Sequence, residues 1–210
     1  YNKVVNQRNK LLKELSFKSS EEKLETLDIW DLQLVKYGTE VMKRRVGFVQ
    51  ELNEIIGGLH EKLSGGTEKL MIEYQPCVEE TTFLDTVTKM RERDLRMKST
   101  CFGPHKDDLI FFINGSEVKK YGSQGQQRTA ALSLKLAEIE LVKKVVKDTP
   151  VLLLDDVLSE LDSSRQNQLL DAIQDIQTMI TCTGLEDFVN HRFHIDKIFK
   201  VEEGKVTSQN

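Results

Sequence analysis

The sequence predicts an α/β protein with an additional helical lobe. Residues 1 to about 64 follow a helical pattern and contain no proline and no β-rich stretch. From about residue 109 onward, short apolar runs alternate with helical segments, which is typical of parallel strands in an α/β layer. We therefore expect a helical lobe over residues 1–99 and an α/β lobe over residues 100–210.

Composition narrows the class of function. Hydrophobic residues make up 39% and charged residues 30% of the 210 residues, which suits a globular protein with a well-solvated surface. The net charge of −4 excludes a protein that coats nucleic acid by bulk positive charge. No apolar run approaches the ~20 residues that span a bilayer, and no secretory signal follows Tyr1. Since there is no initiator methionine, we expect a part of a longer protein.

The cysteines favour a reducing compartment. Cys77, Cys101 and Cys182 are odd in number and widely spaced, and they form neither a CxxC pair nor a zinc-spaced cluster with histidine. Small buried thiols explain them best, which predicts a cytoplasmic protein without structural zinc.

The first 64 residues predict an antiparallel helical arm. Residues 19–22 combine hydroxyl groups with acidic side chains, which is a helix-start signal. Apolar residues then recur at steps of three and four as far as Leu59, with an interruption expected near Gly38. Residues 64–67 contain two glycines and predict the end of the arm.

The remaining residues predict strands and helices. We expect a strand at 69–77, one helix at 81–97 and a β-hairpin at 109–118, whose turn is Asn114-Gly115. The α/β layer then consists of a helix, a strand, a helix, a strand and a terminal hairpin, expected in that order at 123–146, 151–154, 163–173, 178–182 and 197–206.

Two carboxylates follow an apolar strand. Residues 151–154 are all apolar, which predicts a central parallel strand covered by helices on both faces. Asp155 and Asp156 come next, at the carboxyl end where open α/β sheets bind ligands. One carboxylate can hold Mg²⁺, and the other can orient or deprotonate an attacking water. The alternative is a strand that leads into an acidic helix-start loop, with the second acid as a cap.

A polar helix start is the second candidate site. Ser123, Gly125 and Gln126 begin a long helix that has one apolar stripe. The N–H groups and the positive dipole end at a helix N-terminus favour anions. The alternative is an ordinary serine-capped helix after a glycine turn.

Together, these motifs resemble the second half of an ABC-type ATPase. Residues 122–126 resemble the signature motif, residues 151–156 the Walker B motif, and residues 159–162 the D-loop. This order implies the C-terminal half of an ABC-type ATPase head beside an α-helical lobe.

The particular residues are similar to one family within that class. Residues 103–108, 121–128 and 153–162 resemble the RecF family of bacterial DNA replication and recombinational-repair ATPases, which are related to SMC proteins. The resemblance is dense from about residue 100 to 184 and is weaker over the helical arm.

The resemblance implies roles around a nucleotide. The ATP γ-phosphate, held by a second subunit, would be contacted by Ser123, Gln124, Gly125 and Gln126. Asp155 would hold Mg²⁺, and Asp156 would take the place of the catalytic base, which is a glutamate in many ABC proteins.

Three further positions carry implied roles. Ser159 and Asp162 would line the dimer interface near both nucleotides, although Asp162 also suits a helix N-cap. The switch residue of ABC ATPases, often a histidine, corresponds to Thr183 or, as a second choice, Thr181.

A phosphate-binding loop of the form GxxxxGK[ST] is missing from the 210 residues. In RecF-like proteins that loop precedes the helical lobe, so the resemblance implies a C-terminal portion. We expect the chain alone to bind ATP weakly and to hydrolyse essentially none, and its sheet to expose an edge and an apolar face. For residues 103–108, a turn whose aspartates bond local backbone explains the composition.

The family implies ATP-dependent DNA binding in recombinational repair. ATP with Mg²⁺ would join two heads into a homodimer on duplex DNA near single-strand gaps, and RecR and RecO would be partners in loading RecA. The basic side chains that we assign to DNA contact are Lys43, Arg44, Arg45, Arg91 and Arg93. A solvated helix face is the alternative for the run near Arg93.

Two other functions stay open at this point. The chain could be a non-catalytic module that binds RecR or DNA without nucleotide. It could also belong to another SMC-like repair ATPase, but those carry long heptad coiled coils, whereas this arm is short and interrupted by glycine.

Overall fold

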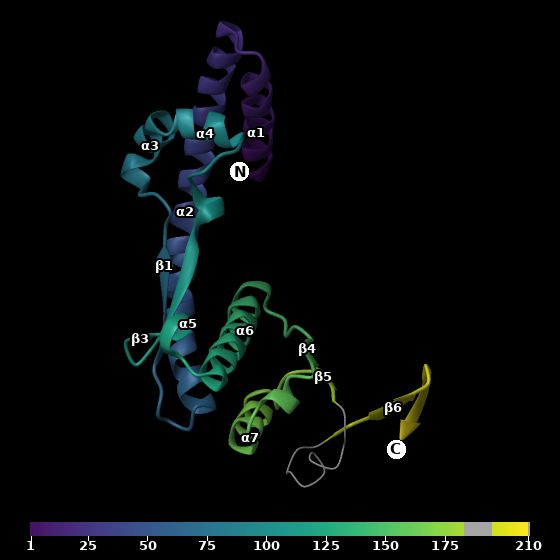
Figure 1. The fold of residues 1–210 in the computed structure, drawn as a ribbon. Helices are drawn as coiled ribbons and strands as arrows, with labels where there is room; N and C mark the ends of the chain where they lie inside the picture. Colours follow the sequence, from purple (N-terminus) through teal and green to yellow (C-terminus); the bar gives the residue numbers. More distant parts are fainter. Residues whose placement is uncertain (183–194, 210) are drawn as a thin grey trace.

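The protein is elongated, with a helical arm at one end and an α/β region at the other (Figure 1). The computed structural model describes residues 1–182 and 195–209. Two helices, α1 (Asn2–Phe17) and α2 (Glu21–Leu63), are joined by a short turn and pack side by side, which confirms the predicted arm. Among the described residues, no helix is both long enough and apolar enough to cross a membrane.

Helix α2 runs without interruption for 43 residues. Its N-cap is Ser20, whose side chain accepts a hydrogen bond from the Lys23 N–H. The interruption predicted near Gly38 is wrong. A Cβ at Gly38 would lie 2.5 Å from Cε1 of Phe83, so the glycine is needed for close packing against that ring and not for a break in the helix.

The segment predicted as one helix at 81–97 consists of two, which corrects that prediction. After a short 3-10 turn, α3 (Phe83–Lys89) ends at Met90, and α4 (Arg91–Met97) begins in a new direction. The break has a packing reason. Phe83 of α3 is buried in an apolar cluster with α1 and α2, while α4 turns a buried Asp94 toward α1.

A buried ionic cluster joins α1, α2 and α4. Arg8 is fully buried, and its guanidinium lies 2.6 Å from both Asp31 of α2 and Asp94 of α4. The same guanidinium donates to Thr100 at 2.9 Å. Arg91 adds a second cation, 2.6 Å from Asp31. Because removal of one member leaves its partners charged and buried, the cluster fixes the relative positions of these helices.

A three-stranded antiparallel sheet packs along the lower part of α2. Strand β1 (Leu70–Gln75) pairs with β2 (Asp108–Ile113) over its whole length, and β2 pairs with the short β3 (Ser116–Glu117). The turn residues Asn114 and Gly115 both have positive φ, as their type of hairpin requires. The sheet therefore joins residues from both sides of the predicted division at 99/100, and that division stays a prediction.

The glycine-proline-aspartate segment at residues 103–108 forms a joint between the arm and this sheet. The Asp107 carboxylate accepts hydrogen bonds from the Cys77 N–H at 2.8 Å, from Arg45 at 2.9 Å and from the Tyr74 hydroxyl. Burial and the bond to Asp107 raise the pKa of Tyr74 to about 12. Only Asp108 bonds local backbone, at Leu109, so the local-turn explanation holds for one aspartate and is wrong for the other.

The α/β region begins with the short α5 (Val118–Tyr121) and the long α6. Two parallel strands follow, with a short 3-10 turn (Leu158–Glu160) between them, and an antiparallel hairpin ends the described chain. The bounds of these elements are α6 (Gln124–Val146), β4 (Leu152–Asp155), α7 (Ser163–Ala172), β5 (Thr178–Thr181), β6 (Ile198–Glu202) and β7 (Lys205–Gln209).

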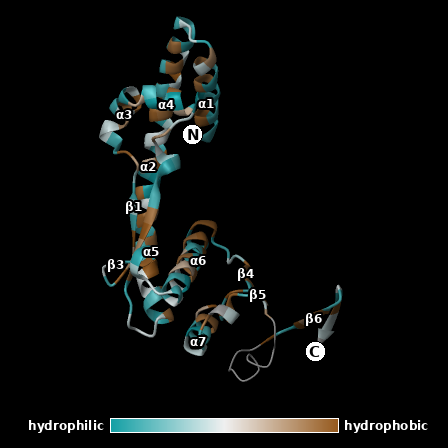
Figure 2. Cartoon of the chain, in the orientation of Figure 1, coloured by the Kyte–Doolittle hydropathy of each residue, from teal (hydrophilic) through white to brown (hydrophobic). Residues whose placement is uncertain are grey.

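Within the described residues, the parallel strands are covered on one face only. Leu152 and Leu154 are buried in a cluster with α6 and α7, whereas Leu153 is 68% exposed and Met179 of the neighbouring strand 62% exposed. Coverage of β4 on both faces is therefore wrong for this chain, while the expected apolar exposed face is present. Figure 2 shows hydrophobic residues along α6 and at β5 in the same region.

Candidate nucleotide-binding site

The N-terminus of α6 is a complete capping box. The Ser123 hydroxyl accepts from the Gln126 N–H at 3.2 Å, and the Gln126 side-chain oxygen accepts from the Ser123 N–H at 2.9 Å. Ser123 and Gln124 are exposed, and Gly125 lies between them and the first buried turn. The structure therefore shows the predicted serine cap, and the anion-favouring role of this tip stays a prediction.

An arginine lies against the glycine of this tip. A Cβ at Gly125 would lie 2.6 Å from Nη1 of Arg165, so the absence of a side chain lets the guanidinium approach the first turn of α6. Arg165 belongs to α7 and is held there by Asp162, whose carboxylate lies 3.2 Å from the same nitrogen. Asp162 is also the N-cap of α7 and accepts from the Arg165 N–H at 3.0 Å. Arg165 thereby connects the glycine assigned to the signature motif with Asp162, which is assigned to the D-loop, within one chain.

The two acids stand at the carboxyl end of β4, as predicted. Asp155 is the last residue of the strand, and its carboxylate accepts a 2.5 Å hydrogen bond from the Thr181 hydroxyl of β5. Asp156 follows with φ of 53°, a left-handed conformation, and its N–H donates to Thr181. This turn ends the strand, and both carboxylates are exposed.

The loop after the acids is closed by local bonds. The Ser159 hydroxyl donates to the Asp156 carbonyl at 2.8 Å, so the exposed Ser159 is placed directly over the acidic turn. Thr181, the second choice for the switch position, donates to the Asp155 carboxylate and accepts from the Asp156 backbone N–H. Thr183, the first choice, lies outside the described residues.

The donor set at the end of β4 fits a magnesium ion. Mg²⁺ prefers oxygen ligands and is usually held by one or two carboxylates together with substrate phosphates and water. Asp155 and Asp156 supply such carboxylates at the surface, and Thr181 fixes one of them. Over residues 1–182 and 195–209, no group of three or more potential ligand side chains forms a closed metal site. The acids alone would hold the ion only weakly, as in sites that the phosphates complete.

The structure gives most of the candidate DNA-binding residues internal partners. Arg45 is paired with Asp107, and Arg91 with Asp28 and Asp31, so both stabilise the arm. Lys43 lies 3.1 Å from Glu80 in an exposed pair. Arg93 is exposed and lies over the ring of Phe102. Arg44 is exposed on α2 beside Lys43.

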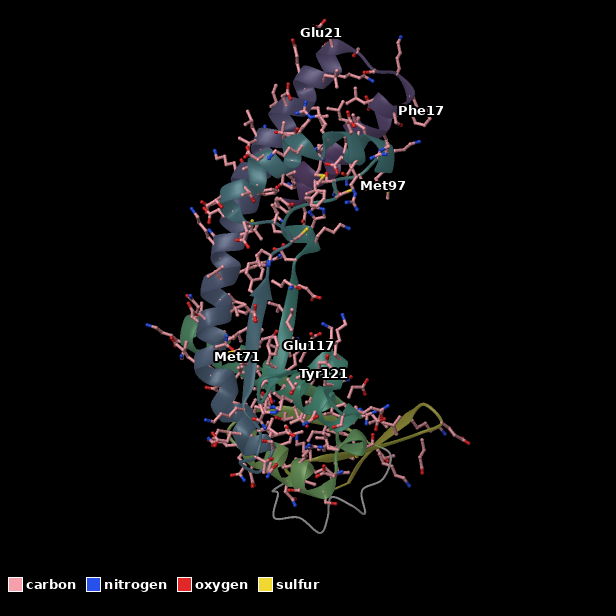
Figure 3. All side chains as sticks on the ribbon, turned by 60° about the vertical axis from the view of Figure 1, so that its left-hand side comes forward. Phe17, Glu21, Met71, Met97, Glu117 and Tyr121 are labelled. Carbon is pink, nitrogen blue, oxygen red and sulfur yellow. The ribbon has the colours of Figure 1, made fainter. Side chains whose placement is uncertain are left out.

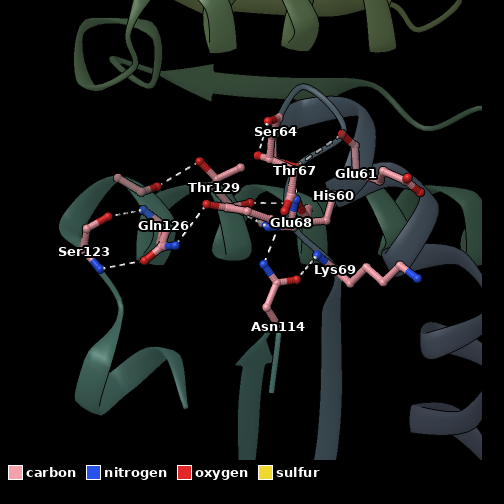
Figure 4. A network of polar contacts seen from close by, with 12 residues as sticks. His60, Glu61, Ser64, Thr67, Glu68, Lys69, Asn114, Ser123, Gln126 and Thr129 are labelled. Atoms are coloured by element: carbon pink, nitrogen blue, oxygen red, sulfur yellow. Dashed lines mark hydrogen bonds and ion pairs between the residues drawn. The ribbon is translucent and has the colours of Figure 1, made fainter. Parts of the chain in front are cut away.

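The sequence did not reveal two residues that shape the α6 tip. Arg165 approaches Gly125, and Glu68, which lies just before β1, accepts a 2.9 Å bond from the Gln126 side chain (Figure 4). Neither belongs to a recognised motif. The only sequence feature that pointed to Arg165 was its position three residues after the segment that resembles a D-loop.

This fold and this arrangement of motifs define one half of an ABC-type ATPase head with a helical lobe. A signature-like helix tip, an acidic strand end and a D-loop occur in the order of that class. The chain is 60% identical over all of its 210 residues to the DNA replication and repair protein RecF of Lachnospira eligens. It belongs to the RecF family.

Other relatives and solved structures agree. RecF of Halalkalibacterium halodurans is 44% identical over 98% of the chain. A solved structure of the recombination mediator protein RecF with ATP in the RecFOR pathway covers the whole chain, with a TM-score of 0.82 and 35% identity. The chain spans 58% of the length of these curated relatives and 57% of that structure. No family model matches the chain.

Proposed function

We propose that this chain supplies one half of a composite ATP site in a DNA-repair ATPase, and that the site is completed by a second protomer. The observation that carries the proposal is the exposed, capped tip of α6, with Arg165 against Gly125. A helix N-terminus and a guanidinium on one surface both favour a phosphate. The relatives solved with ATP and with ATPγS support the choice of ligand.

The acidic end of β4 would serve the nucleotide bound to the same protomer. Asp155, fixed by Thr181, would hold Mg²⁺, and that ion would neutralise charge on the phosphates. Asp156 would accept a proton from the attacking water or orient it. Its side chain is one methylene shorter than the usual glutamate, which favours slow turnover and a switch that is released by hydrolysis. Thr183 is proposed as the switch residue on the resemblance alone.

Self-association would bring the exposed surface around the α6 tip against the other protomer. Ser123 and Gln124 are exposed on it, and Tyr121, directly before the tip, is 76% exposed (Figure 3). Ser159, in the loop after the two acids, is also exposed and would line the same interface. An exposed aromatic beside a candidate ligand site suits an interface that forms only when the ligand is bound. Asp162 would lie at the edge of this interface.

For the whole protein we propose ATP-dependent binding of duplex DNA near single-strand gaps, with RecR and RecO as partners in loading RecA. The relatives named as DNA replication and repair proteins and the RecFOR-pathway structures support this role. Of the basic candidates, Lys43, Arg44 and Arg93 suit DNA contact better than Arg45 and Arg91, which are held by aspartates inside the arm.

The composite site is tested by blocking its tip in the full-length protein. Ser123→Arg puts a bulky side chain at the N-cap, and it should abolish ATP-dependent self-association measured by analytical ultracentrifugation. Ser19→Arg, at an exposed position of the arm turn, is the matched control and should associate normally. Wild-type association of the Ser123 variant would refute the trans site.

A second candidate function is a nucleotide-independent module that binds RecR or DNA. The long arm, which carries its own buried core and ionic cluster, favours this reading because it is structurally complete without nucleotide. A pull-down of RecR with and without ATP separates the two functions. Equal capture under both conditions would favour the module.

A further inference from the structure

Glu68 occupies the junction between the arm helix and the α6 tip. It lies in the link between α2 and β1, and its side chain is only 13% exposed. One carboxylate oxygen accepts from the Gln126 amide at 2.9 Å, and the other lies 3.1 Å from Nε2 of His60, in the last turn of α2. A single partly buried carboxylate thus bridges α2 and the first turn of α6 (Figure 4).

The backbone around Glu68 is fixed from both sides. Its N–H donates to the Ser64 hydroxyl at the end of α2, at 3.3 Å. The next N–H, that of Lys69, donates to Asn114 in the hairpin turn at 2.9 Å, and the Asn114 amide donates back to Thr67. The place of the carboxylate is therefore set by the end of α2 and by the β2–β3 turn, not by the side chain alone.

A second chain of hydrogen bonds also connects α2 with the first turns of α6, beside the Glu68 bridge. His60 is fully buried, and its Nδ1 lies 2.9 Å from the Ser133 hydroxyl of α6. Ser133 donates to the Thr129 carbonyl, and Thr129 donates to the Gly125 carbonyl, each at 2.8 Å. Polar groups buried together in this way hold one arrangement, because a broken bond would leave an unpaired group inside the protein.

Both polar groups of the Gln126 side chain, its oxygen and its amide nitrogen, form hydrogen bonds. Its oxygen accepts from the Ser123 N–H, so only its amide N–H₂ is left for other partners, and that group donates to Glu68. Without the carboxylate, the amide could rotate and the cap at Ser123 would lose its fixed shape. This account differs from a direct contact between Gln126 and the nucleotide.

We propose that Glu68 is a positioning residue, which fixes the nucleotide-facing tip of α6 to the end of the arm helix through Gln126. This inference rests on the trans site proposed above. Glu68 touches no phosphate itself. It acts by holding the Ser123–Gln126 cap in the shape that receives the partner's nucleotide.

The test uses single and double variants of the full-length protein. Glu68→Ala should weaken ATP-dependent self-association about tenfold or more, since a charge-assisted hydrogen bond is lost from the tip. ATP binding by the single protomer, measured with a fluorescent nucleotide at low protein concentration, should not change. Glu61→Ala, at an exposed glutamate near the end of α2, is the matched control and should behave as wild type.

A charge exchange distinguishes positioning from loss of fold. Gln126→Glu alone places two carboxylates face to face and should weaken self-association. Glu68→Gln combined with Gln126→Glu restores a carboxylate–amide pair while the box at Ser123 is kept, so the double variant should associate better than Gln126→Glu. Failure of this rescue, or unchanged association of Glu68→Ala, would overturn the inference. If Ser123→Arg is disruptive while Glu68→Ala is not, the trans site stands and only the role of Glu68 falls.

Discussion

Gly125 and Arg165 are in direct van der Waals proximity, since a methyl group added to the glycine would lie 2.6 Å from Nη1 of the guanidinium. The relationship gives a signature-motif glycine a second reason to lack a side chain. Besides leaving the helix tip open, Gly125 lets a cation from the D-loop helix reach that tip. The positive charge of Arg165 then adds to the positive end of the α6 dipole.

Replacing Gly125 by alanine should displace Arg165 and weaken ATP-dependent self-association of the full-length protein. The new methyl group would force the guanidinium, which is the far end of a flexible side chain, to move away from the helix tip. Gly47→Ala is the control, because no atom lies within 4 Å of its added methyl group and alanine favours a helix interior. Sedimentation with and without ATP measures both variants. Equal association of the two would show that Arg165 has no part in the site.

Stability should depend on pH through His60. Burial lowers the pKa of His60 below its ordinary value of 6.5, although the facing Glu68 opposes this, and Arg165 acts in the same direction as burial. Between the lowered pKa and 6.5 the unfolded chain binds more protons than the folded chain, so the free energy of unfolding rises with pH in that window. Above pH 6.5 the contribution of His60 to the free energy of unfolding is fully present, and this contribution is lost as the pH falls through the lowered pKa.

Urea unfolding at a series of pH values checks this dependence. His60→Gln keeps hydrogen-bonding groups but cannot titrate, so the slope below pH 6.5 should be smaller in the variant than in the wild type. A slope that is the same in both proteins would assign the pH dependence to other groups.

The ionic cluster of the arm predicts a large loss of stability on truncation. Arg8→Ala leaves Asp31 and Asp94 buried with too few partners, which should lower the free energy of unfolding by about 3–5 kcal/mol. Arg44→Ala, at an exposed position of α2, should change it by less than about 0.5 kcal/mol. Denaturant titration compares the two. A small effect at Arg8 would mean that water replaces the guanidinium.

Replacement of Lys43 and Arg44 by glutamine should reduce the salt dependence of DNA binding in the full-length protein. Each phosphate contact that is lost lowers the slope of log affinity against log salt by about 1. Arg45 is left intact, because its bond to Asp107 holds the joint between arm and sheet. An unchanged slope would remove this part of α2 from the DNA interface.

Sequence patterns were sufficient for the elements that depend on local signals. The Asn114-Gly115 turn, the Ser123 cap and the two acids at the end of β4 are each specified by a few neighbouring residues, and all lie at the predicted positions. Gly38 was misread because a glycine in a helix has two explanations, a break or a close approach, and only the distant Phe83 decides between them.

The contacts that shape the candidate site could not be predicted from the sequence, because their partners are also distant along the chain. Glu68 and Gln126 are 58 positions apart, and no periodicity relates them. Likewise, the Asp107 carboxylate is bound by residues from α2 and β1, so its role depends on tertiary packing. Motifs identified the chemistry of the site, but not the buried partners that hold it.

Because α2 is one continuous helix, the orientation of the arm depends on the number of residues in that helix. Each residue added to an α-helix turns everything beyond it by about 100° and advances it by about 1.5 Å. A one-residue insertion between Gly38 and Leu52 would therefore rotate α1 about the axis of α2 relative to β1 and α6. The backbone hydrogen bonds of the helix could all re-form. Only insertions or deletions close to a whole number of helical turns preserve this orientation. The arm should therefore tolerate substitutions on its solvent-exposed side far better than insertions.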